Sequence, residues 1–209
     1  MSETTGAARG RPRTFDRAAA LATAIRLFWE RGYEATSIGD LAEAMEIRSG
    51  SLYAAFGDKR SLFREVVDAY GRSPEGAFIG AALAEEPTAY RAFARILREA
   101  AAVYPDPAHP PGCLTISAAT NVNPRDAEVR AFLRELRAAN LDAFTARLAA
   151  ARRDGELPPD ADPRALAGYL ATLIQGLSQR AQDGADADEL RAVVELALAA
   201  WPGGPAREA

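Results

Sequence analysis

The sequence predicts an all-α protein, and three observations lead to this class. Alanine, leucine, arginine and glutamate, which favour helices, dominate the 209 residues. β-Branched residues never alternate with polar ones over a useful length, and no hairpin dipeptide separates two apolar runs. Because 48% of the residues are hydrophobic, the chain can bury a full core, which excludes a disordered or fibrous class.

The composition also limits the cellular compartment in which the protein is expected and the kinds of chemistry that it can perform. No apolar run approaches the roughly 20 residues needed to span a bilayer, and the N-terminal stretch has no signal-peptide core, so we expect a cytoplasmic protein without a membrane partner. A single cysteine excludes an internal disulfide and a cysteine-based zinc site. With one histidine and no phosphate-binding glycine loop, neither an enzyme nor a metal or cofactor site is expected.

The first four helices follow from caps and periodicity. Asp16 caps a helix whose apolar residues recur at helical spacing until Gly32. A second helix, 37–45, starts at Thr36 or Ser37, and a short third helix covers 49–56. Gly57 ends that helix, and Asp58 caps a fourth one that buries a face ending at Tyr70.

Longer helices are expected in the remainder of the chain. The proline-rich stretch 104–112 is a loop. Asn123 and Pro124 are expected to be the cap and first position of a helix that reaches about Arg153. A second polar, proline-containing stretch, 154–163, precedes the last two helices, near 163–182 and 186–201.

Residues 37–56 form a candidate DNA-reading unit. Two short helices joined by a three-residue turn and preceded by an amphipathic helix are the arrangement in which the second helix enters the major groove. Leu52 and Phe56 anchor that helix, while small or hydrogen-bonding side chains face the bases or, alternatively, phosphate and water: Arg48, Ser49, Gly50, Ser51 and Ala54. Helix pairs of this kind also occur in proteins that do not bind DNA.

Other residues are candidates for phosphate contacts. Tyr53 can reach a phosphate with its hydroxyl, and Lys59, the only lysine, begins a helix whose free N–H groups can share that phosphate. Core packing and a solvated charge are the alternatives. Thr36 and Ser37 can hold a second phosphate by the same route. Arg9, Arg11 and Arg13 form either a minor-groove arm or a solubilising tail.

Residues 20–67 resemble the N-terminal domain of the TetR/AcrR family of transcriptional regulators, without a gap. The matching positions are Phe28, Gly32, Tyr33, Thr36, Ile38, Ala42, Gly50, Leu52, Tyr53, Phe56, Lys59 and Leu62. One departure is Glu46, where the family usually has a glycine in the turn. If this residue needs a left-handed backbone, the glutamate costs about 1 kcal/mol.

The resemblance implies a helix-turn-helix DNA-binding domain followed by a helical ligand-binding and dimerisation domain. The expected divisions are 1–15, a flexible basic arm; 16–60, the DNA-binding domain; 61–202, the effector-binding and dimerisation domain; and 203–209, a disordered tail. The implied function is a homodimeric regulator, a repressor rather than an activator, that binds a palindromic operator and is released by a small molecule. A protein-binding helical adaptor is the alternative; it predicts no effect of Lys59→Ala.

The ligand site is less evident from the sequence. Asn140 interrupts an apolar stripe, so it lines a cavity or bonds a neighbouring helix. The other candidates for a cavity lining, each with core packing as its alternative, are Phe78, Phe93, Leu97, Tyr104, Leu136 and Tyr169.

Cys113 is the remaining candidate for chemistry. It begins a helix, and "GCL" at this place resembles a subgroup of these regulators in which some members sense oxidants or electrophiles through cysteine. A thiol-based sensor is therefore an alternative function, and a small buried hydrophobe is the alternative role. His109, alone between prolines, is assigned no role.

The last two helices carry broad apolar stripes. Their residues follow a four-three-four spacing: Leu166, Leu170, Leu173 and Leu177, then Leu190, Val194, Ala197 and Trp201. Faces this broad are expected to serve both a core and a second contact, and the family resemblance implies that this contact is a four-helix interface between two copies of the chain.

Overall fold

A computed structural model describes residues 16–118 and 122–203, and the expected arm with Arg9, Arg11 and Arg13 lies outside these ranges. The described part is all-α, as predicted, and no strand occurs in it. Its helices are α1 (Arg17–Arg31), α2 (Ile38–Ala44), α3 (Ser49–Phe56), α4 (Lys59–Arg72), α5 (Pro74–Glu85), α6 (Ala89–Val103), α7 (Leu114–Ser117), α8 (Ala127–Arg153), α9 (Pro163–Gln182) and α10 (Ala187–Ala199).

Most helix ends follow the predicted signals. The Asp16 carboxylate accepts hydrogen bonds from the first N–H groups of α1, and Gly32, with φ 77°, ends that helix. The predicted start at Asn123 and Pro124 is wrong by three residues, because α8 begins at Ala127. Asn123 instead makes a turn: its side-chain oxygen accepts from Arg125 N at 3.0 Å, and its carbonyl accepts from Asp126 N at 2.9 Å.

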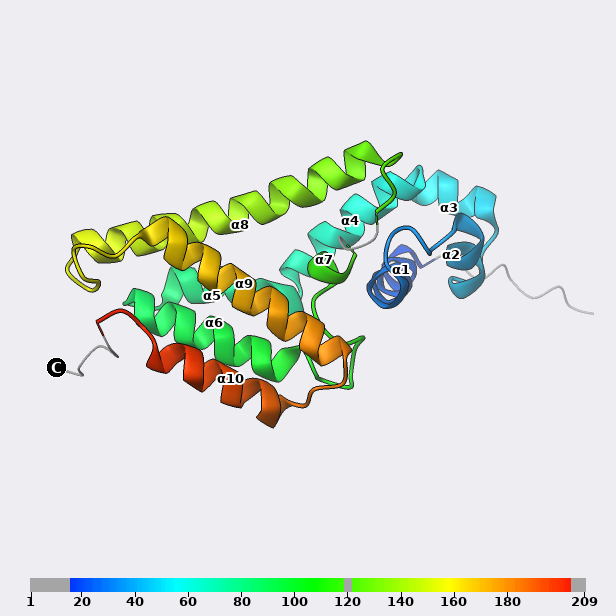
Figure 1. Ribbon diagram of the computed structural model, residues 1–209. Helices are drawn as coiled ribbons and strands as arrows, with labels where there is room; N and C mark the ends of the chain where they lie inside the picture. Colours follow the sequence, from blue (N-terminus) through cyan, green and yellow to red (C-terminus); the bar gives the residue numbers. More distant parts are fainter. Residues whose placement is uncertain (1–15, 119–121, 204–209) are drawn as a thin grey trace, which may run out of the picture.

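Figure 1 shows α1, α2 and α3 grouped at one end, which we call the head, and α5, α6, α8, α9 and α10 packed side by side in what we call the body. Helix α4 runs from the head into the body, where it packs against α5, and the short α7 contacts α1, α4 and α9. Helices α8 and α9 form a hairpin, and α10 packs along α6. None of the described helices is long and apolar enough to cross a membrane.

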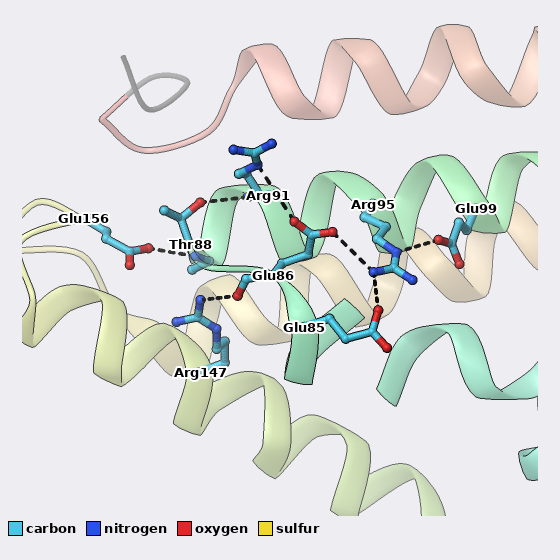
Figure 2. Close-up of polar contacts among 9 residues, drawn as sticks. Glu85, Glu86, Thr88, Arg91, Arg95, Glu99, Arg147 and Glu156 are labelled. Atoms are coloured by element: carbon cyan, nitrogen blue, oxygen red, sulfur yellow. Dashed lines mark hydrogen bonds and ion pairs between the residues drawn. The ribbon is translucent and has the colours of Figure 1, made fainter. Parts of the chain in front are cut away.

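The end of the body that is farthest from the head is closed by packing and by paired charges, and we call it the closed end. Phe93 packs edge-on against Phe144, with ring centroids 5.1 Å apart, and lies 6.0 Å from Trp201. Around the turn between α5 and α6, Arg95 pairs with Glu85 and Glu99 at 2.8 and 2.7 Å (Figure 2). Further bonds in the same network join α8 and the loop after it to this turn.

The apolar stripes of α9 and α10 serve mainly the chain's own core, which corrects the predicted dimer interface. Five residues of the predicted interface are buried within the monomer: Leu170, Leu177, Leu190, Val194 and Trp201. Leu166, Leu173 and Ala197 are half-buried. The side chains that expose large apolar surface on these helices are Tyr169, Val193 and Leu196, the last 75% exposed. Helical spacing identifies an apolar face, but it does not say whether the same chain covers that face.

Candidate nucleic-acid interface

The start of α2 is closed by a reciprocal cap. Ser37 Oγ accepts from Asp40 N at 3.1 Å, and the Asp40 carboxylate accepts from Ser37 N at 2.8 Å. The hydrogen bond from the Ser37 hydroxyl is the main reason that the pKa of Asp40 is lowered. A carboxylate therefore already lies at this helix terminus, and a phosphate held by Ser37 has to share the terminus with it.

Thr36 does not reach this surface, which corrects its predicted role. Its side chain is fully buried, and its hydroxyl donates to the Gly32 carbonyl at 2.8 Å. Because this hydroxyl already donates to a carbonyl at the end of α1, Thr36 positions the start of α2 and does not contact a phosphate.

The turn between α2 and α3 has the geometry that glycine usually provides. Ile47 N donates to the Ala42 carbonyl and Glu46 N to the Glu43 carbonyl, both at 3.0 Å, and Glu46 has φ 55°. A left-handed backbone at a residue with a Cβ costs about 1–2 kcal/mol. The glutamate thus keeps the turn that α3 needs, at some cost in stability.

Helix α3 is anchored on one side and open on the other. Leu52 and Phe56 are buried, and the Arg17 guanidinium lies 4.6 Å from the centroid of the Phe56 ring while it pairs with Glu65 at 2.6 Å. The opposite face is exposed and carries Tyr53, which is 51% exposed. It also carries the predicted base-reading residues Arg48, Ser49, Gly50, Ser51 and Ala54. The structure thus brings these candidates together on one surface.

Lys59 begins α4 as predicted, but its ammonium has an unforeseen neighbour. The Lys59 Nζ lies 4.2 Å from the centroid of the Tyr33 ring. Burial lowers the pKa of Lys59, an effect that the nearby carboxylates of Glu34, Asp126 and Asp40 oppose. Burial also raises the pKa of Tyr33 to about 12. No local sequence pattern predicts this contact, because Tyr33 and Lys59 are 26 positions apart in the chain.

Three candidate ligand residues meet where α1 and α7 contact each other, and we call this region the junction. The rings of Phe78 and Tyr104 are 6.2 Å apart, and Cys113 Sγ accepts a hydrogen bond from the Tyr70 hydroxyl at 3.4 Å. Cys113 precedes α7 as predicted and is buried, at 8% exposure. The Tyr104 hydroxyl is fully buried beside the Cys113 thiol; burial is the main reason that the pKa of Tyr104 is raised, and the thiol adds to this effect.

The other candidate ligand residues are dispersed. Phe93 and Leu97 are fully buried, Phe93 at the closed end, and Leu136 is half-buried. Asn140 is exposed, so the prediction of a buried amide is wrong: the apolar stripe of α8 turns away from the core at this position. Tyr169 is 44% exposed and lines a shallow groove of about 220 Å³ between α9 and α10. These residues do not form one cavity.

A cleft of about 770 Å³ separates the end of α1 from α7 and α9. Trp29 lines it; this indole stacks on His109 at 4.6 Å, and its Nε1 has no partner among the described residues. His109 therefore has a packing role that the sequence did not reveal. No group of three or more His, Cys, Asp or Glu in the ranges described could hold a metal ion.

Comparisons with known proteins agree with this arrangement. A family model of "Bacterial regulatory proteins, tetR family" matches residues 20–66, and a model of "Tetracyclin repressor-like, C-terminal domain" matches residues 89–197. The chain is 35% identical to the HTH-type transcriptional repressor ComR of Escherichia coli (strain K12), over 93% of this chain and 92% of ComR. It is 34% identical to the uncharacterized HTH-type transcriptional regulator YezE of Bacillus subtilis (strain 168), over 90% of this chain and 97% of YezE.

A solved structure is similar over the same length. It contains a cysteine mutant of the TetR family transcriptional regulator CifR complexed with 26-bp double-strand operator DNA. It is 42% identical in sequence, covers 92% of this chain and 100% of CifR, and superposes with a TM-score of 0.85. The helix-turn-helix geometry, both family models and these relatives agree with the resemblance seen in the sequence: the chain belongs to the TetR family of transcriptional regulators.

Proposed function

We propose that the protein is a homodimeric repressor that binds a palindromic operator in the cytoplasm and is released by a small-molecule effector. The observation that carries this proposal is the exposed face of α3, which presents Arg48, Ser51 and Tyr53 on a helix whose other side is anchored in the head. CifR, which is 42% identical, is seen with operator DNA. In this proposal residues 16–60 read DNA, and residues 61–202 bind the effector and dimerise.

The exposed apolar side chains of α9 and α10 support the dimer. Tyr169, Val193 and Leu196 form no part of the chain's own core, and large apolar side chains gathered on a surface are typical of an interface. Each head reads only half of a palindrome, so two copies are needed. Release then follows if the effector prefers a conformer whose two heads are wrongly spaced.

DNA selection from a random library with the purified protein tests operator binding. We expect a palindrome to be enriched. Lys59→Ala should weaken binding to all sequences and lower the slope of log K against log salt by about one. Arg48→Ala or Ser51→Ala should change sequence preference. Arg153→Ala, an exposed position in the last turn of α8, is the control and should change neither property. Failure to enrich any sequence would contradict the proposal.

The dimer has its own test. Leu196→Arg should give monomers in sedimentation and loss of operator binding, without a change in the folded monomer, because this side chain is already exposed. Ala84→Arg, at an exposed position on α5, is the matched control. A dimer that persists in Leu196→Arg would move the interface to another surface.

A specific contact favours a thiol sensor as a second candidate. The Tyr70 hydroxyl lies 3.4 Å from Cys113 Sγ and donates either to this sulfur or to the Glu75 carbonyl, so the thiol has a polar neighbour. An electrophile would then form a sulfur–carbon bond at Cys113 once the buried thiol opens to solvent. Cys113→Ser should retain operator binding and lose release by N-ethylmaleimide. Equal release of both proteins would remove this candidate.

A further inference from the structure

Three arginines share one face in the first half of α8. Arg130, Arg134 and Arg137 are spaced by four and three residues, which places their side chains in one row along the helix. They line a cleft of about 720 Å³. Its remaining lining is mostly apolar and comes from α8 and the segment before it: Val122, Pro124, Ala127, Ala131 and Leu133.

These arginines lack the partners that other arginines of the body have. Arg98, Arg164 and Arg180 each pair with a carboxylate, and Arg95 pairs with three (Figure 2). By contrast, the guanidinium groups of the cleft make no hydrogen bond or ion pair with any residue in the described ranges, and Arg137 Nη1 is buried without an acceptor. A buried donor without an acceptor destabilises the fold, and an acceptor that enters the cleft removes this penalty.

The chemistry of the cleft selects one class of ligand. Guanidinium groups match the geometry of carboxylates and phosphates, which accept two parallel hydrogen bonds. The volume is that of a small-molecule site, and the buried Leu133 gives it an apolar floor. We propose that this cleft binds a small organic anion, with its carboxylate or phosphate on the arginines and a compact apolar body against α8.

The site is connected to the head. Glu128, on the first turn of α8, pairs with Arg60 at 2.6 Å, and the Arg64 guanidinium lies 4.6 Å from the centroid of the Phe132 ring. Both contacts join α8 to α4, which begins directly after α3. An anion that shifts α8 therefore acts on the helix that carries the head. This effector role rests on the proposed function, whereas the binding site itself does not.

Binding is tested on the full chain with three probes that share a linear eight-carbon skeleton: octanoate, octyl phosphate and the neutral octanamide. Calorimetry and thermal unfolding should show binding and a raised Tm for either anion but not for the amide. Arg137→Met should weaken anion binding at least tenfold, and the Arg130→Gln/Arg134→Gln double variant should do the same. The control, Arg153→Gln, removes another arginine of α8 that lies outside the cleft and should bind as the wild type does.

The ligand-free variants provide a second readout. Because Arg137→Met removes an unpaired buried donor, its Tm without ligand should equal or exceed that of the wild type, whereas an arginine with a purely structural role would lower the Tm when replaced. Equal binding of octanamide and octanoate, or unchanged anion binding in both variants, would overturn the proposal. A shift of the variants from dimer to monomer without anion binding would show instead that a second copy covers the arginines.

Operator affinity is measured separately with the selected DNA. Anion binding that lowers operator affinity supports both the site and its effector role. Anion binding without a change in operator affinity supports the site and removes it from the release mechanism. If no DNA is enriched at all, the proposed function fails while the calorimetric test of the cleft still stands.

Discussion

The closed end of the body and the junction differ in how their polar groups are satisfied. At the closed end, charged side chains pair around the α5–α6 turn (Figure 2), and the rings of Phe93, Phe144 and Trp201 pack against one another. The buried side-chain nitrogen atoms that lack partners in the described part of the chain lie elsewhere, on Trp29 at the junction and on Arg137 in α8.

This difference shows where the fold can change at low cost. Buried polar groups without partners are rare and destabilising, and each one points to a function or to a bound water or ion. The junction also contains good hydrogen bonds, such as those from Cys113 N to Ser178 Oγ at 2.9 Å and from Gly112 N to the Tyr104 carbonyl at 2.8 Å, so the low cost of change applies to its unpaired Trp29 indole and not to the junction as a whole. A ligand that acts on the head should therefore bind beside one of the unpaired buried groups, Trp29 or Arg137, while the closed end serves as the rigid support.

The largest effect is expected from a change in the packing at the closed end. Phe93→Ala should lower the free energy of unfolding by about 3–5 kcal/mol, because a fully buried ring that contacts Phe144 and Trp201 leaves a cavity. Urea denaturation at a fixed protein concentration measures this loss. A loss below about 1 kcal/mol would mean that this end repacks easily and is not rigid.

The next test removes one polar contact of the closed end. The Glu156 carboxylate accepts from Ala89 N, at the start of α6, at 2.7 Å (Figure 2). Glu156→Ala should cost about 1–2 kcal/mol, as the loss of a helix cap does. Glu135→Ala, at an exposed position on α8, should stay within about 0.5 kcal/mol of the wild type in the same denaturation experiment.

Two tyrosines at the junction form a matched pair. Tyr70→Phe should cost about 1 kcal/mol, because the Tyr70 hydroxyl donates to the Glu75 carbonyl at 3.1 Å or to Cys113 Sγ. Tyr104→Phe removes a buried hydroxyl whose polar neighbour is the Cys113 thiol, a weak hydrogen-bonding group, and should therefore cost less than Tyr70→Phe. If both variants lost the same free energy in urea, the Tyr104 hydroxyl would be as well satisfied as that of Tyr70, and the contrast between the two regions would weaken.

The smallest effect concerns an exposed ion pair on the body. Glu195 accepts from Arg98 at 2.8 Å, and this hydrogen bond lowers the pKa of Glu195. A lowered folded-state pKa stabilises the protein above the ordinary value of about 4.3, and this contribution is lost as pH falls through the folded-state pKa.

Glu195→Gln should therefore cost at most about 0.5 kcal/mol at pH 7, and less as pH falls below about 4.3 or in 1 M salt. Thermal unfolding at these conditions measures the difference. A loss above about 1 kcal/mol at neutral pH would show that surface charges, rather than buried rings, hold the body together.

The sequence predicted the head better than it predicted the body. Phe56 and Leu52 lie at the buried face of α3, and Arg48 and Ser51 at its exposed face, because a helix this short has only one apolar side. Thr36 was misplaced, since a residue before a helix can point either to the terminus or to the core. In α8, Asn140 was expected to be covered by a neighbouring helix that the structure does not place there.

By itself, the sequence determined the helical class, both ends of α1 and α3, the start of α4, and the family. Caps such as Asp16 and Asp58, and stops such as Gly32 and Gly57, act within a few residues of their own positions and can be recognised without a fold. Only the tertiary structure decided that the stripes of α9 and α10 face their own core, that Lys59 lies over the Tyr33 ring, and that the arginines of α8 stay unpaired. Burial and pairing depend on residues that are far apart along the chain, and no local pattern carries that information.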